Sequence, residues 1–125
     1  MAKILAVDDE PKITKLLEAI LTPQGYEVIT AANGLEALEK VDADGIDLVL
    51  LDVMMPGMDG FEVLKILRAK EEKKTLPVIL LTALSETEDR VKGMEAGCSD
   101  FITKPFERSD VIARVKEALK GRKCF

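Results

Sequence analysis

Hydrophobic residues follow two alternating patterns along the chain, short apolar runs and helical periodicity. Three near-continuous apolar runs, at residues 4–7, 48–51 and 78–81, are typical of strands that are covered on both faces of a parallel sheet. Two weaker runs, at residues 26–30 and 100–103, are mixed or short and favour strands nearer the edges. The pattern therefore predicts five strands, of which three lie in the interior of one sheet.

Helical patterns lie between these runs. After the first run, apolar residues recur at the spacing of one helix face, which predicts a buried stripe on an amphipathic helix. The members of this stripe are Ile13, Leu16, Leu17, Ile20 and Leu21. The last helix shows the same spacing, and its expected core-facing residues are Val111, Ile112, Val115 and Leu119.

Three helix starts are marked by residues that satisfy or avoid unpaired backbone amides. Pro11 suits a first turn because it has no amide hydrogen. Asn33 and Ser85 are each followed three residues later by a glutamate, Glu36 and Glu88, as in a capping motif. These signals predict helices that begin shortly after the first, second and fourth strands.

The order of elements is a strand followed by a helix, repeated five times. This order predicts an α/β fold: a (βα)5 doubly wound, five-stranded parallel sheet between helical layers, in a single domain over residues 1–125. In open sheets of this kind, ligand sites lie at the carboxyl ends of the strands, near the point where the strand order reverses. The residues that end the strands are therefore the first candidates for chemistry.

Acidic residues end two of the predicted strands. Asp8 and Asp9 end the first strand, and Asp52 ends the third, within the segment LLDVMMPGMDG. With the strand order 2-1-3-4-5 these two strands are neighbours, so the three carboxylates form one cluster. Crowded carboxylates repel one another unless a cation lies among them, and oxygen ligands favour Mg²⁺. The sequence therefore predicts a Mg²⁺ site.

A hydroxyl and a cation follow two other strands. Thr82 ends the fourth strand, and Lys104 follows the fifth. Neither side chain is needed to hold Mg²⁺, but both suit an incoming anion that has several oxygens. The anion we infer is a phosphoryl group. Asp52 would supply the attacking oxygen, Lys104 would neutralise charge, and Thr82 with nearby backbone amides would bind the transferred oxygens.

Composition and charge narrow the classes of function. The formal net charge of −5 over 125 residues argues against a nucleic-acid surface or an anionic-membrane surface. No apolar stretch is long enough to span a membrane, and acids occur early in the chain, so we expect a cytoplasmic protein. Histidine is absent, which excludes Ser-His-Asp and Cys-His catalysis. Cys98 and Cys124 are too few for a disulfide framework or a metal cluster.

Together these residues resemble the receiver domain of two-component response regulators, over essentially the whole chain. The resemblance rests on Asp8 with Asp9, on Asp52, on Thr82 in LLTA, and on Lys104 before a proline. It implies the flavodoxin-like receiver fold and a regulatory domain rather than an enzyme, because a receiver catalyses only its own phosphorylation and dephosphorylation. It also implies that a sensor histidine kinase or a phosphotransfer protein phosphorylates Asp52, with Mg²⁺ as the cofactor.

The resemblance assigns roles to the groups around a bound metal and phosphoryl group. Asp9 and Asp52 would be carboxylate ligands of Mg²⁺, and Asp8 would act mainly through water. The Met54 carbonyl would be a further metal ligand. The Ala83 backbone, together with the lysine, would bind the phosphoryl oxygens.

The resemblance further implies a conformational switch. The Thr82 hydroxyl would move toward the phosphoryl group, and the Phe101 ring would turn inward. The peptide bond that follows Lys104 would be cis, which a following proline permits at modest cost. Met54 and Leu84 are bulky and apolar at positions that flank the path of the hydrolytic water, which predicts slow dephosphorylation. The pair of changes Met54→Asn and Leu84→Glu is expected to shorten the lifetime of the phosphorylated form.

The last third of the chain resembles the receivers of winged-helix DNA-binding regulators. In that subfamily, a phosphorylation-induced homodimer forms ion pairs at the positions that match Arg90 with Asp110, Asp100 with Arg114, and Glu95 with Lys116. On composition alone, these mixed charges describe a solvated surface. The predicted output face, for a homodimer or for a downstream effector, comprises Arg90, Glu95, Asp100, Phe101, Asp110, Arg114 and Lys116. The chain ends soon after the last helix, so we expect either a single-domain regulator or a receiver from a longer protein.

Other classes of protein would need features that this sequence lacks. A phosphatase of the haloacid dehalogenase type would carry a second acid at the position of Met54. A flavodoxin-like FMN carrier would have a Ser/Thr/Gly phosphate loop in place of DDEPK, and a P-loop or dinucleotide fold would need glycine fingerprints. The alternative that stays open is a degenerate pseudo-receiver, which is an interaction module without phosphoryl transfer. Such a module would have lost one of the five site residues, and this sequence has all of them.

Overall fold

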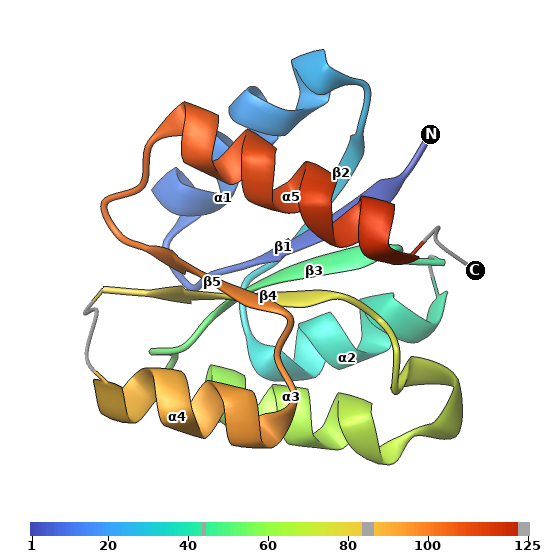
Figure 1. The fold of residues 1–125 in the computed structure, drawn as a ribbon, viewed down its shortest axis with the longest axis vertical. Coiled ribbons are helices and arrows are strands. Elements are labelled where there is room, and N and C mark those ends of the chain that lie inside the picture. Colours follow the sequence, from blue (N-terminus) through green and yellow to red (C-terminus); the bar gives the residue numbers. More distant parts are fainter. Residues whose placement is uncertain (44, 84–86, 123–125) are drawn as a thin grey trace.

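Strands and helices alternate along the backbone. The computed structural model describes residues 1–43, 45–83 and 87–122 (Figure 1). The strands are β1 (Lys3–Val7), β2 (Glu27–Ala31), β3 (Leu48–Asp52), β4 (Val78–Thr82) and β5 (Asp100–Thr103). The helices are α1 (Pro11–Leu21), α2 (Gly34–Ala43), α3 (Gly60–Ala69), α4 (Thr87–Ala96) and α5 (Arg108–Arg122), with short 3-10 helices η1 (Thr22–Gln24) and η2 (Glu71–Lys73).

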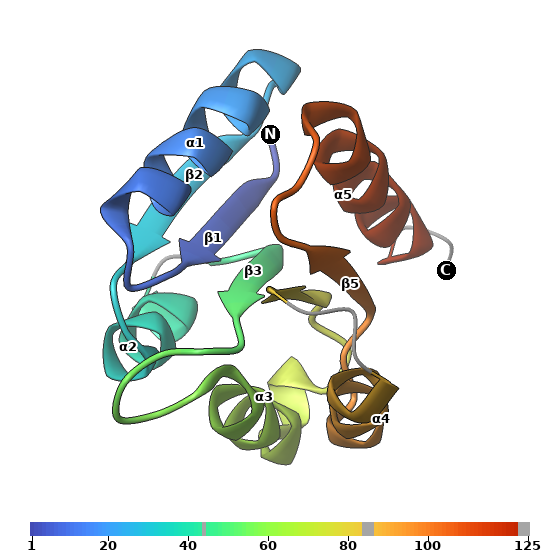
Figure 2. The ribbon, with the colours of Figure 1, turned by 90° about the vertical axis from the view of Figure 1, so that its left-hand side faces the viewer.

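The strands form one parallel sheet in the order β2-β1-β3-β4-β5, which confirms the predicted order. Neighbouring strands are in register near their carboxyl ends, where Val7 pairs with both Ala31 and Leu51. Helices α1 and α5 cover one face of the sheet, and α2, α3 and α4 cover the other (Figure 2). The direction of the chain across the sheet reverses between β1 and β3, so a ligand site is expected at the carboxyl ends of these two strands.

Each face of the sheet has its own hydrophobic core. Along β3, Leu48 and Leu50 belong to the core under α1 and α5, whereas Val49 and Leu51 belong to the core under the other three helices. Successive side chains of a strand point to opposite faces, so a strand between two helical layers is apolar at nearly every position. All the residues of β3 are buried, including Asp52 at its end.

The buried face of α1 differs from the predicted stripe at one position. Leu17, Ile20 and Leu21 are buried, but Leu16 is 45% exposed, so that part of the prediction is wrong. Leu16 lies about 100° around the helix axis from Leu17, at the margin of the buried face. Thr14 is buried on that face instead, and its short side chain is accommodated because its hydroxyl donates to a backbone carbonyl one turn earlier.

Two of the three predicted helix starts are confirmed. Pro11 is the first residue of α1. The Asn33 side chain accepts a hydrogen bond of 2.9 Å from the Glu36 N–H, which satisfies an amide at the start of α2. The prediction at Ser85 and Glu88 falls on a residue and a side chain outside the described part of the structure.

The last helix packs on the sheet as its pattern predicts. Val111, Val115 and Leu119 are buried, and Ile112 packs against the same core from a partly exposed position. Within the described residues, no helix combines the length and the apolar character needed to cross a membrane.

Candidate functional site

The candidate residues lie at the carboxyl ends of four strands, and these strand ends form one edge of the sheet. Asp8 directly follows β1, Asp52 is the last residue of β3, Thr82 is the last residue of β4, and Lys104 directly follows β5. These strands are parallel and lie side by side, so their carboxyl ends meet at the same edge. The fold thereby collects residues that are far apart in the sequence.

Three carboxylates lie close together at this edge. Asp8 and Asp52 are buried, with exposed fractions of 1% and 4%, whereas Asp9 is exposed. One oxygen of each carboxylate lies within 4.8 Å of the others. Buried acids at this spacing repel one another and require a nearby positive charge.

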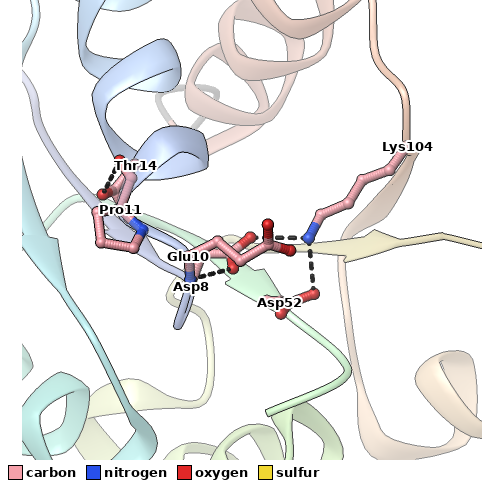
Figure 3. Close-up of polar contacts among 6 residues, drawn as sticks. All are labelled: Asp8, Glu10, Pro11, Thr14, Asp52 and Lys104. Atoms are coloured by element: carbon pink, nitrogen blue, oxygen red, sulfur yellow. Dashed lines mark hydrogen bonds and ion pairs between the residues drawn. The ribbon is translucent and has the colours of Figure 1, made fainter.

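The ammonium group of Lys104 bridges the two buried carboxylates (Figure 3). Its Nζ donates to Asp8 Oδ2 at 2.7 Å and to Asp52 Oδ1 at 3.1 Å. The other Asp8 oxygen accepts a hydrogen bond of 3.0 Å from the Glu10 backbone N–H. The Lys104 side chain is 16% exposed, so these ion pairs are largely shielded from water. The lysine therefore supplies the positive charge that the buried acids require.

The backbone holds Lys104 at the sheet edge. Its N–H donates a hydrogen bond of 2.7 Å to the Thr82 carbonyl, which fastens the chain after β5 to the end of β4. The peptide bond between Lys104 and Pro105 is cis, which confirms that prediction. The side chain thus reaches the acids from a backbone position fixed by the neighbouring strand.

Burial and charge perturb the ionisation of the bridged groups. Burial raises the pKa of Asp52 to about 6; the hydrogen bond from Lys104 opposes this shift, and the negative charge of Asp8 adds to it. Burial acts to lower the pKa of Lys104, but the hydrogen bonds to Asp8 and Asp52 outweigh burial, so the pKa lies above its usual value. Lys104 is therefore charged at neutral pH. Asp52 is mostly ionised at neutral pH, but its pKa of about 6 lies close to that pH.

The carboxylate cluster fits a hard divalent cation. Mg²⁺ binds through one or two carboxylates and keeps several of its waters. Asp9 is the exposed member of the cluster, and therefore leaves it open to a hydrated ion. An added cation would also lower the raised pKa of Asp52, because it favours the charged carboxylate. Within the described residues, Asp8, Asp9 and Asp52 are the one group of three acids with this spacing.

The loop that follows Asp52 is fastened to the end of β3. The Gly60 N–H donates to the Val53 carbonyl at 3.0 Å. A Cβ atom on Gly60 would lie 2.4 Å from the Asp52 carbonyl oxygen, so any other residue would push α3 away from the strand. Asp59 and Glu62 then begin α3 with a reciprocal capping box. The loop geometry is thus set by backbone contacts at both ends.

The sequence also predicts roles for the backbone of Met54, two residues after Asp52, and of Ala83, at the end of β4. The Met54 backbone opposes the burial-driven rise in the pKa of Asp52, and the Met54 side chain is 75% exposed. Ala83 directly follows β4 and is exposed. Leu84, which was paired with Met54 in the prediction of slow dephosphorylation, lies outside the described residues.

Phe101 lies on β5 and packs under α4. Its side chain is partly buried against the core on that face. A Cβ atom on Gly93 of α4 would lie 2.8 Å from ring atoms of Phe101 and from Leu80, so the glycine allows the ring to approach the helix. The Arg90 guanidinium lies 5.5 Å from the ring centroid. The sequence signal for Gly93 is only a glycine inside a helix, which indicates close packing without identifying the partner.

The predicted output face contains an ion-pair network within the chain. Arg114 donates from Nε to Asp110 at 2.9 Å and from Nη1 to Asp100 at 2.8 Å. The pairing of Asp100 with Arg114, expected between two copies, thus also forms inside one copy. Glu95 and Lys116 are exposed on α4 and α5, where they are accessible to a partner.

Comparison with protein families and curated proteins adds independent evidence. The family model of the response regulator receiver domain matches residues 4–116. The chain is 49% identical over 118 residues to the alkaline phosphatase synthesis transcriptional regulatory protein PhoP of Bacillus subtilis, covering 94% of this chain and 48% of that protein. It is 49% identical over 115 residues to the response regulator PleD of Caulobacter vibrioides, covering 92% of this chain and 25% of that protein. The chain therefore spans about half or less of these relatives.

Solved structures with the same fold are also similar in sequence. The chemotaxis protein CheY4 of Vibrio cholerae superposes with a TM-score of 0.91 at 36% identity, covering 94% of this chain and 98% of that one. A putative response regulator of Chloroflexus aurantiacus superposes with a TM-score of 0.91 at 39% identity, covering 95% and 98%. With its strand order and its family match, this flavodoxin-like chain belongs to the response regulator receiver domain family of two-component signalling.

Proposed function

We propose that residues 1–125 form a single receiver domain that works as a phosphorylation-controlled switch. Asp52 accepts a phosphoryl group from the phosphohistidine of a sensor histidine kinase or of a phosphotransfer protein. The observation that carries the proposal is the Lys104 ammonium, which bridges the buried Asp8 and Asp52 carboxylates. Phosphoryl transfer requires a positioned acceptor and positive charge near the phosphoryl oxygens more than it requires covalent chemistry from the protein.

In the transfer step, an Asp52 carboxylate oxygen forms a bond to phosphorus, and the bond from phosphorus to the donor histidine nitrogen breaks. The electron pair of the broken bond stays on the imidazole nitrogen. The imidazole ring of the donor protein is then neutral, or it takes up a proton. With a pKa of about 6, Asp52 is mostly the reactive carboxylate at neutral pH. Lys104, already bonded to one Asp52 oxygen, is close enough to bond an oxygen of the transferred group.

The neighbouring acids would hold the metal ion that this reaction needs. Asp9 and Asp52 would bind Mg²⁺ with the Met54 carbonyl, and Asp8 would orient the ion through water. When bound, the ion supplies positive charge to the phosphoryl oxygens. The spacing of the three carboxylates, within 4.8 Å, supports this assignment.

The acyl phosphate would favour one of two packing arrangements. The Thr82 hydroxyl and the Ala83 backbone would bind its oxygens, while the Phe101 ring turns inward from its partly buried position under α4. Phe101 has no hydroxyl, so its two positions differ only in packing. A ligand that contacts one arrangement better shifts the population toward it.

The signal would leave by protein–protein contact in the cytoplasm, through the output face defined above. The receiving partner would be an effector protein, an effector domain or a second phosphorylated copy. The greater length of the relatives supports an effector domain, and one of them is described as a transcriptional regulatory protein. In a homodimer, Arg114 would exchange its internal contact with Asp100 for one across the interface, and sedimentation of the phosphorylated protein would detect the change in mass.

Intact-mass measurement after incubation with acetyl phosphate tests the proposal. The wild type is expected to gain one phosphoryl group in the presence of Mg²⁺, and to gain none without Mg²⁺ or after Asp52→Asn. Asp42→Asn is the matched control, because Asp42 is an exposed carboxylate paired with Lys70 away from the site, and it should gain the group normally. A wild type that gains no group would favour the pseudo-receiver, an interaction module without phosphoryl transfer.

A further inference from the structure

A surface cleft lies beside the site, between the β3–α3 loop and α4. Its volume is about 550 Å³, within the range of small-molecule sites. Its floor is formed by three apolar side chains, Val53, Met55 and Phe61, each less than 10% exposed. Above this floor, the Met54 side chain is 75% exposed and provides most of the apolar surface on which a small molecule can bury one face.

Among the described residues that line this cleft, Lys92 is the one cation. Lys92 Nζ lies 4.9 Å from the centroid of the Phe61 ring and makes no ion pair with the residues that the structure describes. The carboxylate in the lining, Asp59, is occupied by the capping box, where it accepts the Glu62 N–H at 2.9 Å. The lining thus presents a positive charge above an apolar floor.

Met54 connects the cleft to the acidic site. Its exposed side chain lines the cleft, and its backbone follows Asp52 by two residues. A molecule that packs against the Met54 side chain would restrict the backbone directly after Asp52. Occupation of the cleft would therefore change the reactivity of Asp52.

We propose that the cleft binds a small aromatic anion, with its ring against Met54 and the Phe61 floor and its negative group on Lys92. A ring gains favourable contacts from the aromatic floor and from methionine sulfur. A carboxylate or a similar group gains a charge-assisted hydrogen bond from the ammonium. An aliphatic anion or a neutral aromatic molecule has only one of these contributions. Binding of the anion does not depend on the proposed function. The effect of binding on phosphorylation does rest on the proposed function.

The binding step is tested with 2-naphthoate on the unphosphorylated protein without Mg²⁺, by NMR titration. We expect saturable binding below about 1 mM, with shifts concentrated on the lining residues. Neutral 2-naphthamide and aliphatic octanoate should each bind at least about fivefold more weakly. Naphthoate with no saturable binding, or with shifts scattered over the whole surface, would overturn the proposal.

Variants separate the cation at the rim from charge in general. Lys92→Gln should weaken naphthoate binding at least about fivefold, and Lys92→Arg should keep it within about twofold. Lys15→Gln is the matched control, because Lys15 is an exposed lysine on α1, on the opposite face of the sheet, and it should bind as the wild type. Equal affinity in wild type and Lys92→Gln would refute the assigned role of Lys92.

The link to Asp52 has its own readout. Saturating naphthoate should change the rate of phosphorylation by acetyl phosphate at least about twofold in the wild type, and Lys92→Gln should need a correspondingly higher naphthoate concentration for the same change. Binding with an unchanged rate would refute the Met54 link and support the cleft alone. Binding to a protein that takes up no phosphoryl group under any condition would support the cleft and refute the proposed function, so the two failures are distinguishable.

Discussion

Two cation-centred clusters in this chain have almost the same geometry and different surroundings. We refer to Asp8, Asp52 and Lys104 as the edge cluster, and to Asp100, Asp110 and Arg114 as the surface cluster. In the edge cluster the ammonium bonds two carboxylates at 2.7 and 3.1 Å, and in the surface cluster the guanidinium bonds two carboxylates at 2.8 and 2.9 Å. Distances alone therefore do not distinguish a chemical site from a surface ion-pair network.

Access of water distinguishes the two clusters. The side chains of the edge cluster are at most 16% exposed, and those of the surface cluster are at least 33% exposed. Burial raises the pKa of Asp52 to about 6, while in the surface cluster the hydrogen bonds to Asp110 and Asp100 raise the pKa of Arg114, which is charged in any case. Water screens exposed pairs, so the loss of one partner has a large effect only in the edge cluster.

The largest expected effect is that of Lys104→Met. Without Mg²⁺ at neutral pH, we expect the free energy of unfolding to fall by about 3 kcal/mol, because two buried carboxylates lose their cation. Urea denaturation of the variant and the wild type measures the difference, and added Mg²⁺ should restore part of it. A loss below about 1 kcal/mol would mean that the edge cluster behaves like a surface pair.

The next effect is that of Asp52→Asn, which should stabilise the metal-free protein at neutral pH by about 2 kcal/mol. The native carboxyl group takes up its proton near pH 6, and the unfolded one near its ordinary value of 3.8, so the native state binds more protons between these values. Wild-type stability from this group therefore falls as the pH rises from about 4 to about 6. Urea denaturation across this range should show that fall in the wild type and lose it in the variant; equal slopes would contradict the raised pKa.

A smaller effect is expected from the metal. At a Mg²⁺ concentration about ten times the dissociation constant, the free energy of unfolding should rise by about 1.4 kcal/mol, because the ion binds the native state. Asp9→Asn should remove most of this rise, and Asp42→Asn, outside the site, should keep it. Thermal or urea unfolding with and without the ion gives the values. An undiminished rise in Asp9→Asn would place the ion elsewhere.

The smallest effect is expected in the surface cluster. Arg114→Met should lower the free energy of unfolding by less than about 1 kcal/mol, because exposed ion pairs contribute little. The difference should shrink further at high salt, which screens exposed charges. Urea denaturation at low and high salt tests both points. A loss as large as that of Lys104→Met would remove the contrast between the clusters.

The sheet and the position of the acids could be predicted because both follow from local pattern and topology. Apolar runs indicate strands buried on both faces, and a parallel sheet brings the carboxyl ends of neighbouring strands together. Asp8 and Asp52 are therefore close to each other once β1 and β3 are neighbours. The function of each acid is a further step, since the same side chains also occur as ordinary loop residues.

Contacts that depend on the approach of two helices, or on the choice of a side-chain rotamer, were not predictable from the sequence. The exposure of Leu16 depends on how widely the sheet and its neighbours cover α1. The packing of the Phe101 ring against Gly93 depends on the distance between α4 and the sheet. Arg114 pairs with Asp100 of its own chain, and the resemblance to winged-helix regulators pairs it with Asp100 of a second copy. The types of the two residues do not decide between these pairings.

The closed loop after β3 makes the chain a scaffold for grafting. The hydrogen bond from Gly60 to Val53 fixes both ends of the intervening segment, and the missing side chain of Gly60 keeps α3 against Asp52. Lengthening a loop with fixed ends adds little entropic cost. Foreign recognition sequences inserted between residues 54 and 59 would thus be presented next to an unchanged carboxylate, so that new binding specificities can be coupled to one existing chemical group.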